Sequence, residues 1–123
     1  IWEEIEMKRE SFLCEKSKAL ALRMIRLYKY LCEEKKEFVI SKQILRSGTS
    51  IGANIREAIR AQSNADFIAK LYISLKETEE TLYWLELLRD AEYIPYKNIQ
   101  AIYDESESMV KVLNRSIISA KQG

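Results

Sequence analysis

Residues 41–61 read SKQILRSGTSIGANIREAIRA, and this stretch decides the fold of the chain. At about 100° per residue it forms an amphipathic helix, apolar on one side and basic on another. The apolar side comprises Ile44, Leu45, Gly48, Ile51, Gly52, Ile55 and Ile59. The other side carries four cations, here called the basic stripe: Lys42, Arg46, Arg56 and Arg60. The pattern predicts a helix over residues 41–62 with Ser41 as its N-cap.

Gly48 and Gly52 stand one turn apart on the apolar side of this helix. A glycine inside a helix costs about 1 kcal/mol relative to alanine, so the pair indicates a structural need. Without a Cβ on the facing side, a neighbouring backbone can approach closely. We therefore predict close helix packing at both glycines, in a central helix against which the other helices are set.

Three further helices are predicted from their apolar periodicity, over residues 11–34, 64–91 and 96–120. Ser63 and Asp66 form a capping pattern before the third helix, and Pro95 separates the third from the fourth. Residues 1–10 are weakly patterned and fit either a helical turn or a loose lead-in. Long helices joined by short turns predict an all-α fold, an antiparallel up-down-up-down four-helix bundle in one domain.

The third helix has a second apolar face, almost opposite its main seam. Its members are the candidate oligomer-interface residues Ile73, Trp84, Leu87 and Ala91, together with Ala69. Two apolar faces require two sets of neighbours, so the pattern favours a homo-oligomer. The alternative is that the N-terminal segment folds back over this face.

The composition excludes several function classes. The chain has 123 residues, a net charge of +1, two cysteines and no histidine. No apolar run approaches the length of a membrane span, so no membrane partner is expected. Cys14 and Cys32 fall on one helix about 27 Å apart, which predicts reduced thiols and a cytoplasmic location. No ligand cluster or buried acid–base pair stands out, so we expect no metal, no cofactor and no enzymatic activity.

The basic stripe is the main candidate for function, because phosphate contacts need only positive charge at suitable spacing. Other candidate nucleic-acid-binding residues extend it or run beside it on the first helix: Lys35, Lys36, Arg23, Arg26 and Lys29. Tyr30 is the tyrosine best placed for exposure, whereas Tyr28, Tyr72, Tyr83 and Tyr103 border apolar seams. The alternative is that acidic residues of the last two helices, or of a partner, pair with these cations. The chain would then be a protein-interaction scaffold with no direct nucleic-acid contact.

Residues 41–55, SKQILRSGTSIGANI, resemble the signature of the four-helix-bundle proteins encoded in intervening sequences of bacterial large-subunit rRNA genes. Residues 15–17, 21–23, 67–70 and 83–88 agree, so the resemblance covers about residues 12–121. The same family includes the accessory variability proteins of diversity-generating retroelements. The resemblance implies a homopentamer. For the retroelement members it also implies binding of RNA or DNA and association with a reverse transcriptase.

Overall fold

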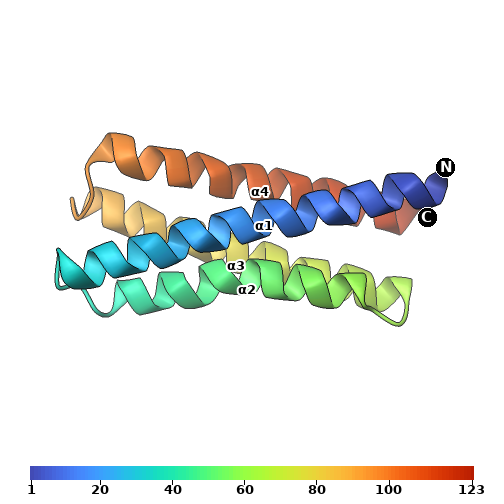
Figure 1. Cartoon of the computed structure of the whole chain (residues 1–123), viewed down its shortest axis with the longest axis horizontal. Helices are drawn as coiled ribbons and strands as arrows, with labels where there is room; N and C mark the ends of the chain where they lie inside the picture. The colour runs from blue at the N-terminus through green and yellow to red at the C-terminus, as the bar shows by residue number, and fades with distance from the viewer.

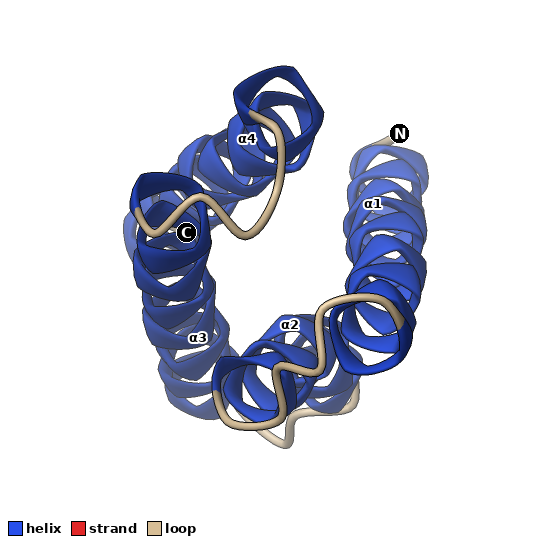
Figure 2. Cartoon of the chain, turned by 90° about the vertical axis from the view of Figure 1, so that its left-hand side faces the viewer, coloured by secondary structure: helices blue, strands red, loops and turns tan.

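The computed structural model describes residues 1–123 and contains four α-helices and no strand. They are α1 (Trp2–Glu33), α2 (Ile40–Ile59), α3 (Asn64–Asp90) and α4 (Tyr96–Gln122). Successive helices run in opposite directions, and both chain termini lie at one end of the bundle (Figure 1). Seen end-on, the helices follow one another around a ring in chain order (Figure 2). The predicted all-α bundle is confirmed. None of the helices has an apolar stretch long enough to span a membrane.

The N-terminal segment is helical and continues α1 outward. The buried seam of α1 advances in alternating steps of four and three residues from Leu13 onward. The same steps taken backward from Leu13 reach Glu10 and then Glu6. These acidic residues cannot enter the core, so nearly all of the first turns are exposed. The helix α1 packs against α2 and α4 but not against α3. The alternative that residues 1–10 cover the second face of α3 is therefore wrong.

The start of α2 differs from the prediction. Its N-cap is Val39, not Ser41, and Ser41 is buried in the first turn. The first backbone N–H groups of a helix have no partner within it, and here they donate to the carboxylate of Glu37. The nitrogen-to-oxygen distances are 3.2 Å for Val39, 3.0 Å for Ile40 and 2.7 Å for Ser41. Burial would raise the pKa of Glu37, but these backbone hydrogen bonds outweigh it and lower the pKa below its usual value.

This cap makes the start of α2 sensitive to pH. We expect Glu37→Gln to lower the free energy of unfolding at neutral pH by about 1 kcal/mol. Because the folded-state pKa of Glu37 is lowered, its contribution is present above the unfolded-state pKa and lost as the pH falls through the folded-state pKa. Urea unfolding of both proteins at neutral and at acidic pH checks this. A difference that stays the same in acid contradicts the assignment.

The glycine-bearing helix is uninterrupted and packs closely against α1. A Cβ built on Gly48 would lie 2.5 Å from Cγ of Met24, and one built on Gly52 would lie 3.1 Å from Oγ of Ser17. The close approach is thus made mainly by side chains of α1. The helix α2 contacts α1 and α3 but not α4, just as every other helix of the ring contacts only two others. The prediction of a central helix against which the other three are set is therefore wrong.

Small hydroxyl residues allow α2 and α3 to approach closely. Thr81 donates a hydrogen bond to Ser47 at 2.8 Å, and Ser74 donates to the carbonyl of Ile51 at 2.8 Å. All three hydroxyl side chains are fully buried and satisfied. Eighteen buried apolar residues complete the core, which runs along the length of the bundle. Ser63 caps α3 by accepting a hydrogen bond from the Asp66 backbone N–H, as predicted.

Candidate nucleic-acid interface

The two halves of the chain differ in charge: residues 1–62 carry thirteen lysines and arginines against nine acidic residues, and residues 63–123 carry seven against ten. The contrast is strongest away from the two termini. Residues 11–62, which hold most of α1 and all of α2, carry eleven lysines and arginines against five acidic residues. Residues 63–110 carry four against ten. Residues 16–32 and 38–56 contain no acidic residue at all. The face formed by α1 and α2 is therefore the basic side of the molecule.

The basic stripe divides into free and paired cations. Lys42, Arg56 and Arg60 are exposed and make no ion pair. Arg46 instead forms salt bridges with Glu77, at 3.2 Å, and with Glu80 of α3. Burial would lower the pKa of Arg46, but the two carboxylates outweigh it and raise the pKa above its ordinary value. Arg46 already has its anionic partners, so the free charge of α2 lies toward its two ends.

The surface between those ends has few free hydrogen-bond donors. The hydroxyl of Thr49 donates to the Leu45 carbonyl at 2.7 Å, and that of Ser50 donates to the Arg46 carbonyl at 2.7 Å. Both hydroxyls are thus held by their own helix. Recognition at this surface would depend on charge and not on base-specific hydrogen bonds.

The predicted cations of α1 do not all lie beside α2. Arg23 forms a salt bridge with Glu105 of α4 at 3.3 Å, and Arg23 and Arg26 both line a hollow between α1 and α4. The prediction that these two arginines run beside the basic stripe is wrong, because the packing of α1 turns them toward α4. Tyr30 lines the same hollow.

Lys29 and Lys18 are exposed residues of α1, each within about 100° around the helix of a residue that contacts α2. Lys29 precedes Cys32 by one turn, and Cys32 contacts Ser41, so Lys29 lies level with the start of α2. Lys18 follows Ser17, which faces Gly52, so Lys18 lies level with the C-terminal half of α2. Both lysines are exposed and unpaired. Lys18 was missed from the sequence, although the acid-free run of residues 16–32 pointed to it.

The turn between α1 and α2 supplies one further cation to the basic side of the molecule. Lys36 is exposed at the turn, with a positive φ of 52°. Lys35 is also exposed and makes no ion pair, but it lines a separate hollow with Arg89, Asp90 and Glu92. We define the outer basic face by its exposed, unpaired cations: Lys18, Lys29, Lys36, Lys42, Arg56 and Arg60.

The second face of α3 is uncovered in the single chain. The side chain of Ile73 is 40% exposed and Ala91 is exposed, whereas Leu87 is half-buried. Trp84 packs partly on the core and donates its indole N–H to Glu80 at 3.0 Å. Tyr83, whose ring centroid lies 5.2 Å from that of Trp84, is 53% exposed. Tyr72 is also exposed, so these two tyrosines add to the open surface of α3.

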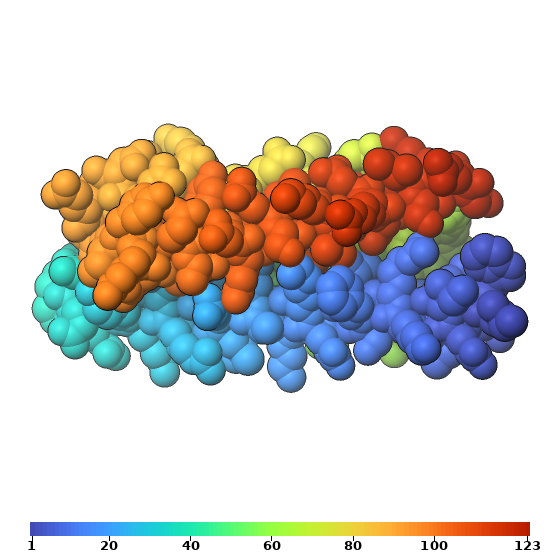
Figure 3. All heavy atoms as spheres, turned by 90° about the horizontal axis from the view of Figure 1, so that it is seen from above, coloured from blue at the N-terminus to red at the C-terminus, as the bar shows by residue number.

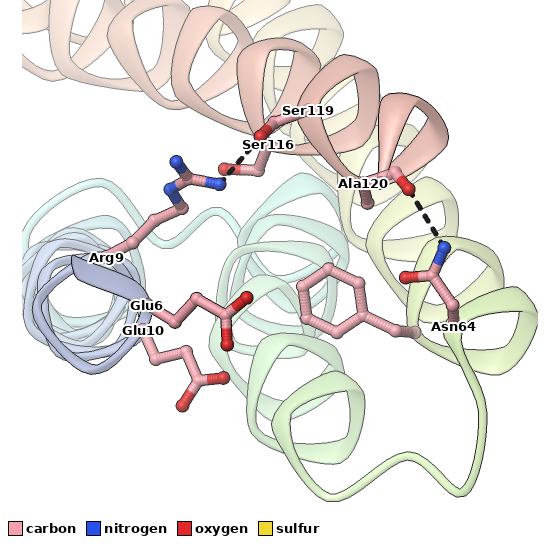
Figure 4. Close-up of a pocket in the computed structure, with 9 residues that line it drawn as sticks. Glu6, Arg9, Glu10, Asn64, Ser116, Ser119 and Ala120 are labelled. Carbon is pink, nitrogen blue, oxygen red and sulfur yellow. Dashed lines mark hydrogen bonds between the residues drawn. The ribbon is translucent and has the colours of Figure 1, made fainter. Parts of the chain in front are cut away.

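A mixed-charge hollow lies at the terminal end of the bundle (Figure 4). The carboxylates of Glu6 and Glu10 point toward it from α1. Phe67 of α3 also lines it. Arg9 donates to Ser119 of α4 at 2.8 Å across the same end. No group of three or more histidine, cysteine or acidic side chains is close enough to hold a metal ion. Both cysteines are free.

A family match and a similar crystal structure both agree with the four-helix fold. Residues 9–115 match the family described as 23S rRNA-intervening sequence protein. A protein of unknown function from the S23 ribosomal protein family of Bacteroides thetaiotaomicron has a similar crystal structure. The two chains share 55% identity with a TM-score of 0.87, over 89% of this chain and 97% of the other. No curated protein matches the chain.

Proposed function

The chain belongs to the 23S rRNA-intervening sequence protein family, and from this premise we propose that it is a non-enzymatic, oligomeric adaptor that binds nucleic acid. The observation that carries the proposal is the outer basic face. Its six cations are exposed and free of ion pairs, and they lie on α1, on α2, in the turn between them and at the C-cap of α2. Both helices have long acid-free stretches. The remaining acidic residues are concentrated on α3 and α4.

The binding mode follows from the arrangement of these cations. Lys29 and Lys42 lie near one end of the α1–α2 pair, and Lys18 and Arg56 near the other. Helix rise puts Lys42 and Arg56 about 21 Å apart along α2. Two separated groups of cations fit two stretches of a phosphate backbone. Such contacts would be tolerant of sequence and strongly weakened by salt.

The direct test is fluorescence anisotropy with labelled duplex RNA, duplex DNA and single strands. We expect binding at about 50 mM salt and a steep loss by about 200 mM. Absence of binding to every probe at low salt would refute the proposal. A protein-interaction scaffold is the alternative function. It is favoured by one observation, that Arg46 and Arg23 already pair with carboxylates.

Self-association through the uncovered face of α3 is part of this proposal, and the family resemblance implies five subunits. We expect the wild type to have a mass several times 14.4 kDa in light scattering. Because Ile73 and Leu87 lie on that face, the double variant Ile73→Glu, Leu87→Glu should be monomeric. Ile118→Glu is the matched control, since Ile118 is an exposed apolar residue of α4. An unchanged mass for the double variant would show that subunits meet elsewhere.

The compartment is also a proposal. Cys14 and Cys32 are both free, and both lie on α1, too far apart in the helix to pair. We place the protein in the cytoplasm, where thiols stay reduced.

A further inference from the structure

The seam between α1 and α4 is the loosest in the bundle. These helices share far fewer contacts than the three pairs that are neighbours in sequence. They are antiparallel, with Arg9 bonded to Ser119 at one end and Arg23 paired with Glu105 further along. In the space-filling view, α4 lies beside α1, and the two part toward the chain termini, where the helices behind are visible between them (Figure 3).

Three hollows follow one another along this seam. The first lies between Arg9 and Arg115, the second beside Lys16 and Ala19, and the third between Arg26 and Asn98. We call their combined course the α1–α4 groove. From Arg9 to Tyr30 it follows 22 residues of α1, about 32 Å at the rise of an α-helix.

The floor of the groove is apolar. Leu20 and Leu27 of α1 line it and are themselves almost fully buried. Phe12, 52% exposed, lines it near the terminal end, with Val112 of α4 opposite. Small side chains at the centre, such as Ala19, leave room above the floor. Because the two leucines are already buried, the apolar area that an occupant would cover comes from Phe12, Ala19 and the partly exposed Val112.

The edges of the groove are basic. Five cations line it, four from α1 and one from α4: Arg9, Lys16, Arg23, Arg26 and Arg115. The single acidic residue that lines it is Glu105, which is already paired with Arg23. Glu6 and Glu10 line the adjoining hollow at the terminal end of the bundle, which shares Arg9 with the groove. An occupant that complements both floor and edges is apolar along one side and acidic along the flanks.

We propose that the α1–α4 groove is the docking site for an acidic amphipathic helix of a partner protein, about 20 residues long. Such a helix would lie as a fifth helix in the ring, with its apolar face on Phe12, Val112 and Ile102 and its carboxylates beside Lys16 and Arg26. A polyanion gains nothing from the apolar floor and meets Glu105 midway. The groove uses none of the six cations of the outer basic face, so the inference does not depend on the proposed function.

The test uses two synthetic fluorescent 21-residue peptides. One has leucines at helical spacing with glutamates on the flanks; the other has lysines in place of the glutamates. We expect only the acidic peptide to bind. The variant Lys16→Glu, Arg26→Glu should bind it at least about 10-fold more weakly, and Phe12→Ala also more weakly.

Lys18→Glu, Lys29→Glu is the matched control. It reverses two charges on the same helix, at exposed positions outside the groove, and should change peptide affinity less than about 2-fold. Circular dichroism verifies that each variant is folded. Equal weakening by both variants, or equal binding of both peptides, overturns the proposal.

Two other occupants have distinct signatures. If the variant Lys16→Glu, Arg26→Glu instead abolishes concentration-dependent self-association, a second copy of the chain fills the groove. If the same variant abolishes duplex RNA binding while leaving peptide affinity unchanged, the groove is a polyanion site. Either result refutes the partner-helix assignment. Loss of RNA binding in the control variant alone supports the outer basic face and leaves the groove proposal intact.

Discussion

The triple variant Lys42→Glu, Arg56→Glu, Arg60→Glu is expected to bind duplex RNA on the order of 100-fold more weakly than the wild type at low salt. Each of these side chains is exposed and has no ion-pair partner within the chain. Their full charge is therefore available to phosphates, and its reversal adds repulsion. Anisotropy titrations at several salt concentrations measure the loss, and the slope of log affinity against log salt should also become shallower.

The control must change net charge by the same amount. Lys76, Lys97 and Lys111 are exposed on α3 and α4 and make no ion pair. Reversing these three should weaken binding by less than about 5-fold, through the general field alone. If the control loses as much affinity as the triple variant, binding follows overall charge and the outer basic face is not the site.

Gly48→Val is expected to lower the free energy of unfolding by about 3 kcal/mol. A Cβ at this position would lie 2.5 Å from Cγ and 3.0 Å from Cβ of Met24, which is fully buried. Atoms so near the Met24 backbone cannot move away without shifting α1 from α2. Valine is also stiff at χ1, so it cannot rotate out of the contact. Urea unfolding measures the change.

Gly52→Ala is the matched comparison, because it adds a methyl group one turn away. Its Cβ would lie 3.1 Å from the hydroxyl of Ser17, a mildly tight contact. Replacing a helix-interior glycine by alanine also stabilises the helix by about 1 kcal/mol, which offsets this contact. We expect a change below about 1 kcal/mol. Met24→Ala should recover part of the loss caused by Gly48→Val. A Gly48→Val protein as stable as the wild type would show that α1 and α2 are further apart than described.

The sequence contained most of the fold because helix periodicity and capping are local properties. The Ser63 cap and the seams of all four helices were readable from spacing alone. The cap of α2 could not be predicted from spacing, because the capping carboxylate belongs to Glu37, two residues before the N-cap position. From there it accepts hydrogen bonds from three backbone N–H groups. The N-terminal turns were ambiguous because acidic residues occupy the positions where the seam should continue.

The binding surfaces were less predictable, because they depend on how each helix is rotated against its neighbours. Arg46 and Arg56 share a stripe in sequence, yet only Arg46 lies within reach of carboxylates on α3. Arg23 and Lys29 are six residues apart on one helix, but Arg23 faces α4 and Lys29 lies on the outer surface. Periodicity gives the angle between two residues, whereas packing decides which neighbour each one meets.

The scarcity of contacts between α1 and α4 also bears on how the chain folds. Since α1–α2, α2–α3 and α3–α4 provide nearly all of the packing, most contacts join segments close in sequence. Chains with such low contact order fold within microseconds to milliseconds, because little loop-closure entropy is lost before contacts form. Each hairpin can assemble as it emerges, with no need for the two ends of the chain to find one another first.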